Sequence, residues 1–141
     1  MKKIKLLAIG ASAAFAFTAV TSQIAVAAEE EAAATSKMTI PDTADGILQE
    51  IHKHRGELTE TVKAKKLKDV HVQAFMIRDL ANALPAKVAA DKKARVEGSA
   101  KNITKLAEDL DTSGDAGDQA KTESNLKKFD AVLAQLEGQF K

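Results

Sequence analysis

Three histidines are the side chains of this 141-residue chain best suited to bind a transition-metal ion, because the chain contains no cysteine. His52 and His54 are two residues apart, so on a helix they point about 200° away from each other and cannot grip one ion. His54 and His71 are expected on neighbouring helices, about 9 Å apart along the axes, which is also too far. The predicted metal ligands are nevertheless His54, His71 and His52, because no cysteine competes with them. A dimer is one way to bring two of these histidines together. The alternative is a buried, neutral histidine that is hydrogen-bonded to a neighbour.

Met38 and Met76 are a second group with metal chemistry, since thioethers suit copper(I). Two dispersed methionines make no Met-rich motif, however. We expect Met76 to pack beside Leu80 near the helix surface.

An acidic stretch follows the start of a calcium-loop pattern, D-x-[DN]-x-[DN]-G. Its residues are Asp109, Asp111, Ser113 and Gly114. Ala120 stands where that loop needs a bidentate glutamate. The simpler interpretation is that these small and acidic residues end one helix and begin the next.

Several functional classes are excluded by composition. Without cysteine there is no disulfide, thiolate zinc site, iron–sulfur cluster or cysteine nucleophile. The 21 basic and 20 acidic residues give a net charge of +1, without the basic and aromatic interleaving of a nucleic-acid binder. No nucleophile–base set, paired-carboxylate site or phosphate loop stands out, so we expect no enzymatic activity.

Residues 1–27 have the three-part layout of a cleaved secretory signal peptide. Three lysines lie within the first five residues, residues 6–20 form an uncharged apolar run, and Ala25-Val26-Ala27 offers small residues for cleavage. The apolar run is short for an anchor of about 20 residues. We therefore expect a periplasmic protein with no membrane span after cleavage. The acidic, alanine-rich stretch 28–42 is expected to be a flexible tail.

Hydrophobic residues at helical spacing predict four helices, over about 43–64, 67–84, 91–110 and 119–139. The first two could be one rod, but their apolar stripes are out of phase, which favours a reversal near Lys65 and Lys66. Pro85 ends the second helix, and 111–118 reads as a loop. The predicted fold is all-α: an antiparallel up-down-up-down four-helix bundle over residues 43–141.

This outline resembles the periplasmic four-helix-bundle cytochromes of the b and c-prime types, through its export signal, helix number and size. That resemblance implies the bundle but no haem. The c-prime members need a Cys-x-x-Cys-His segment, and this chain has no cysteine. The b-type members use a methionine early in the first helix and a histidine in the last. Here Met38 precedes the first helix, and the last helix has no histidine.

The stretch from Ile51 to Leu84 also resembles small periplasmic helical proteins that are loosely associated with heavy-metal efflux. We therefore expect a binding protein, monomeric or homodimeric, that serves as a copper, zinc or nickel stress accessory. The alternative is an interaction module of a cell-envelope complex without a metal ligand. That alternative predicts an exposed apolar patch around Met76 and Leu80 for a protein partner.

Overall fold

The computed structural model describes residues 38–141, which are almost entirely helical and include no strand. The four α-helices are α2 (Ala44–Lys63), α3 (Val70–Ala83), α4 (Ala90–Asp115) and α5 (Gln119–Glu137). Two short 3-10 helices, η1 (Leu67–Asp69) and η2 (Leu84–Lys87), stand before and after α3. The all-α prediction with four helices is confirmed. The predicted signal peptide, 1–27, and residues 28–37 of the predicted tail lie outside the described residues.

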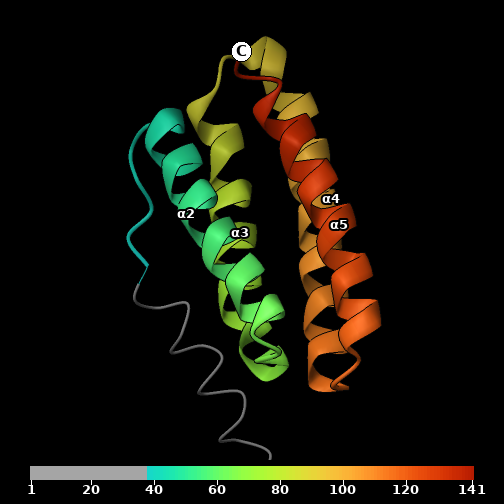
Figure 1. Cartoon of the computed structure of the whole chain (residues 1–141). Coiled ribbons are helices and arrows are strands. Elements are labelled where there is room, and N and C mark those ends of the chain that lie inside the picture. Colours follow the sequence, from blue (N-terminus) through green and yellow to red (C-terminus); the bar gives the residue numbers. More distant parts are fainter. Residues whose placement is uncertain (1–37) are drawn as a thin grey trace, which may run out of the picture.

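Consecutive helices lie side by side along their lengths, as Figure 1 shows. The link from α2 to α3 lies at the lower end of that view, and the link from α3 to α4 lies at the upper end. Each helix packs extensively on the next one in the chain, whereas α2 and α5 touch much less. None of the helices in residues 38–141 combines the length and the apolar character that a membrane crossing requires.

The core is aliphatic, and it is built from the helical stripes that the sequence predicts. Phe129 is its one fully buried aromatic side chain. The largest fully buried aliphatic side chains are Ile47, Ile51, Leu58, Ile77, Leu80, Leu84, Ile103, Leu110, Leu133 and Leu136. Burial of each such side chain contributes about 1.5–3 kcal/mol, so these helices are held mainly by mutual packing.

The helix ends around α2 follow from local chemistry. The Thr43 hydroxyl accepts a hydrogen bond from the Gly46 N–H at 3.1 Å, which caps the first turn of α2. At the other end, Lys65 has a left-handed φ of 59°, and the Lys66 N–H donates to the Thr61 carbonyl at 3.1 Å. This closing turn ends the helix without a glycine. The predicted break between the first two helices is confirmed, and a single rod is wrong.

The predicted loop at 111–118 is wrong for most of its length, because α4 continues to Asp115. Asp109, Asp111 and Ser113 therefore stand on helical turns and form no calcium loop. Tertiary packing overrides the weak helix propensity of this stretch. Ser113 is buried, and its hydroxyl donates to the Leu110 carbonyl at 3.1 Å. The loop that remains before α5 is residues 116–118.

The exposed apolar patch predicted around Met76 and Leu80 is also wrong. Leu80 is 0% exposed and belongs to the core, and Met76 is half-buried. Met38, in the part of the predicted tail that the structure describes, packs against the core as well. Among the described residues, Ile40 is the only large hydrophobic side chain classed as exposed, at 41%.

Gly114 permits a close approach between α4 and the segment that leads into α3. A Cβ atom at this position would lie 2.5 Å from the Leu67 carbonyl oxygen and 3.5 Å from the Val70 Cβ. The first separation is far below van der Waals contact, and the clashing atom belongs to the backbone, which cannot rotate away. Only glycine therefore fits between α4 and the start of α3.

We expect Gly114→Ala to destabilise the protein by about 1–3 kcal/mol, because α4 must move away from the Leu67 carbonyl. Gly98→Ala is the matched control in the same helix, since a Cβ atom there meets nothing within 4 Å. That control should stabilise the helix by up to about 1 kcal/mol. Urea unfolding of both variants measures the difference. Equal effects of the two substitutions would contradict the proposed role of Gly114.

Candidate metal-binding sites

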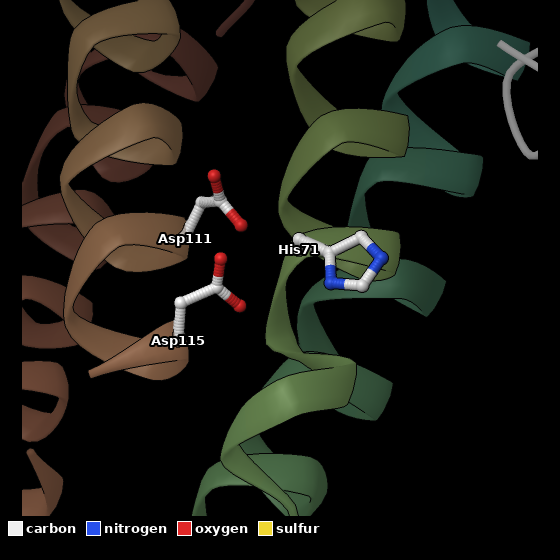
Figure 2. Close-up of side chains that lie close together, drawn as sticks. All are labelled: His71, Asp111 and Asp115. Carbon is white, nitrogen blue, oxygen red and sulfur yellow. The ribbon is translucent and has the colours of Figure 1, made fainter. Parts of the chain in front are cut away.

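His71, Asp111 and Asp115 form a cluster between α3 and α4. Each offers one ligand atom, and these atoms all lie within 4.8 Å of one another. Figure 2 shows both carboxylates on the side of α4 that faces α3, with His71 opposite them. Asp111 and Asp115 are four residues apart and therefore share one face of the helix. His71 and Asp111 are half-buried, and Asp115 is exposed.

The close packing at Gly114 explains why these three residues meet. Gly114 lies between Asp111 and Asp115 in α4, and the Val70 Cβ that it faces belongs to the residue just before His71. The contact that needs a glycine is thus part of the same surface as the cluster. The Phe75 ring also borders His71, and the centroids of the two rings are 6.3 Å apart.

Two local rules of helix stability are broken at the cluster. Carboxylates at positions i and i+4 repel each other. Asp115 is also the last residue of α4, at the negative end of the helix dipole, where acidic side chains are unfavourable. A cation between the carboxylates would reverse the sign of both effects. Violations of this kind are characteristic of functional sites.

One imidazole nitrogen and two carboxylate oxygens are a suitable donor set for zinc and similar divalent ions. Bonds of about 2.1 Å in a tetrahedral site bring neighbouring ligand atoms about 3.4 Å apart. The observed limit of 4.8 Å is therefore wider than a loaded site would be. A bound ion would require these ligand atoms to come closer together.

His54 lies at a second location, on α2. It is 8% exposed and lines a groove of about 300 Å³. The complete lining is Met38, Thr39, Glu50, Lys53, His54 and Met76. The Nδ1 atom of His54 is 2.8 Å from the Gln73 Oε1 atom and 3.0 Å from the Glu57 Oε2 atom. Its Nε2 atom lies 3.8 Å from the Glu50 Oε2 atom.

His52 lies at a third location, between α2 and α5. Its side chain is 55% exposed, and its Nε2 atom is 3.5 Å from the Glu137 Oε1 atom. Nearby, the Arg55 Nε atom donates to the Asp130 Oδ1 atom at 2.7 Å. Polar side chains thus connect α2 and α5 where few contacts join them. The structure places the three predicted histidines at three separate locations and brings none of them together.

Sequence analysis missed the partners of each histidine. Asp111 and Asp115 would have been noticed as an acidic pair at i, i+4 only if the stretch had been assigned to a helix. Met38 and Met76 are 38 positions apart in the sequence, so no local pattern could reveal that they share a groove. Comparison with known proteins adds nothing to these assignments: no family model, curated protein or solved structure matches the chain.

We expect Asp115→Asn to stabilise the metal-free protein by about 0.5–1 kcal/mol, because it removes a carboxylate from a helix C-terminus and from a like-charged neighbour. Unfolding in the presence of a chelator measures the change. Asp109→Asn is the matched control, because the Asp109 carboxylate lies 3.6 Å from the Lys105 ammonium. That control should leave stability unchanged or slightly lower. A loss of stability in Asp115→Asn would show that the metal-free carboxylate is not repelled at this position.

Proposed function

We propose that this chain is an exported, non-enzymatic helical-bundle protein that binds a divalent transition-metal ion through His71, Asp111 and Asp115. The observation that carries the proposal is the convergence of one imidazole and two carboxylates, from two helices, within 4.8 Å. In this proposal the protein acts as a metal-stress accessory in the periplasm. Zinc, nickel and copper(II) are the ions that suit this mixed nitrogen and oxygen set.

The charges at the cluster favour a divalent ion. Two carboxylates supply two negative charges, and the histidine adds a nitrogen ligand that calcium and magnesium do not prefer. The exposed position of Asp115 leaves an entry path from solvent, and the half-buried His71 and Asp111 supply the more rigid side of the site. The ion would link α3 to α4.

The proposal includes the finer points of the fold and the cellular location. Short links at 64–66, 88–89 and 116–118 support an up-down-up-down arrangement, because links of this length connect antiparallel neighbours. The signal layout of residues 1–27 supports export. The alternative function, an interaction module of an envelope complex, has lost the apolar patch that it predicted, because Leu80 is buried.

Calorimetric titration of the full chain with zinc(II), nickel(II) or copper(II) tests the proposal. We expect one ion bound at submicromolar strength. At a free concentration one hundred times Kd, the ion should stabilise the fold by about 2.7 kcal/mol. His71→Gln and Asp115→Asn should each weaken binding at least about tenfold, since each removes a ligand atom.

His52→Gln is the control variant for this experiment. It removes an imidazole that lies beside Glu137 between α2 and α5, away from the cluster, so its affinity should equal that of the unmodified chain. Binding that is lost in His52→Gln but retained in His71→Gln would overturn the assignment. Absence of heat with all three ions would overturn the function itself.

A further inference from the structure

The groove beside His54 collects all of the sulfur atoms in the described part of the chain. Met38 reaches it from the irregular segment before α2, and Met76 reaches it from α3. His54 lines the same groove from α2. Since the chain has no cysteine, its sulfur donors after residue 1 are these two thioethers. Three separate segments thus bring two thioethers and one imidazole to a groove of about 300 Å³.

The hydrogen bonds of His54 orient its ring as in a metal ligand. An ionised carboxylate can only accept, so the contact between Nδ1 and Glu57 requires the proton to be on Nδ1. The Gln73 Oε1 atom accepts from the same N–H group. In the neutral ring the lone pair is therefore on Nε2. Metal-binding histidines characteristically donate their other N–H to a carboxylate or carbonyl, which fixes the ring.

The Nε2 atom of His54 carries the lone pair that a small cation would bind. Its neighbour at 3.8 Å is the Glu50 Oε2 atom, which is also an acceptor and is too distant for a hydrogen bond. His54 is more than nine-tenths buried, so water has little access to its ring. A cation at the groove would bind the Nε2 lone pair, beside a carboxylate that Lys53 already pairs.

The net charge of the groove distinguishes it from the cluster on α4. Lys53 and Glu50 both line it, and their side chains form an ion pair of 3.4 Å, so their charges offset each other. The remaining donors are neutral thioethers and a neutral imidazole. Lys53 repels a divalent ion more strongly than a monovalent one, and the carboxylates near His54 are already engaged, Glu50 with Lys53 and Glu57 with the Nδ1 atom of His54. A soft monovalent ion meets a smaller repulsion and prefers thioethers over oxygen ligands.

We infer that this groove is a binding site for copper(I), with Met38, Met76 and His54 as ligands. The flexible methionine side chains allow both sulfurs to turn toward one ion. His54 contributes Nε2, and Glu57 and Gln73 hold its ring in place. The inference does not depend on the proposed function, because it involves different residues, a different charge and a different class of metal. The protein would then carry a soft, monovalent site and a harder, divalent site.

The test uses the full chain labelled with carbon-13 at the methionine methyl groups. Silver(I) serves as a redox-inert probe with the same ligand preference as copper(I). We expect one equivalent of silver(I) to shift the methyl resonances of Met38 and Met76 and to leave that of Met1 in place. Competition with a chromogenic copper(I) chelator under anaerobic conditions then measures affinity.

Met38→Leu and Met76→Leu are the informative variants, because leucine retains most of the volume and apolar character of methionine. Each should weaken copper(I) binding at least about tenfold, and the double variant about a hundredfold or more. His52→Gln is the matched control, because it removes an imidazole that lies outside both proposed sites, and its copper(I) affinity should be unchanged. Zinc(II) affinity in the methionine variants should also be unchanged, so failure at one site is distinguishable from failure at the other.

Three outcomes would overturn the inference. Silver(I) could bind without moving either methyl resonance, which would place it elsewhere. The leucine variants could bind copper(I) as tightly as the unmodified chain. Finally, the chain could bind neither silver(I) nor copper(I) although circular dichroism shows that it is folded and helical.

Discussion

The contact between Gly114 and the Leu67 carbonyl sets the position of α4 against the start of α3. It allows two backbones to approach where any side chain would force them apart. Because His71 follows this contact on one side and Asp111 and Asp115 flank Gly114 on the other, the same approach determines whether imidazole and carboxylates can meet. The packing of α4 on α3 and the candidate metal site therefore both depend on Gly114, which lies in a stretch whose sequence is typical of a loop.

Hydrophobic periodicity was sufficient to predict the number of helices and most of the core. The break after α2 followed from a change in the phase of the apolar stripe, and Pro85 correctly indicated the end of α3. The end of α4 was predicted wrongly, because Asp, Ser and Gly have turn-forming tendencies that local reasoning cannot weigh against burial. Gly114 is buried against Leu67 and Val70, more than forty positions away, and no local window contains such a contact.

The candidate sites were predictable only in part, for a related physical reason. Histidines in a cysteine-free chain are evident from composition. Their partners depend on register between helices, and register is decided by packing. His54 illustrates the point: its place on an apolar stripe indicated burial, but Gln73 on the facing helix could be identified only from the structure. Met38 was even less predictable as part of a site, since the segment that contains it was expected to be a flexible tail.

The distribution of polar contacts argues that His52 has a structural role. The helices α2 and α5 share few contacts, and side chains such as Arg55 and Asp130 connect them across a half-exposed surface. Ion pairs of this kind contribute about 0–1 kcal/mol each, so most of the bundle's stability comes from the apolar contacts between consecutive helices. His52 and Glu137 belong to this polar seam. The other two histidines differ in the donors around them, because His71 lies beside two carboxylates of the facing helix and His54 lines a groove with two thioethers. An ion at His71 would join α3 to α4, and an ion at His54 would join the segment containing Met38 to α2 and α3. Binding free energy at either junction would thus be added to the apolar packing between consecutive helices.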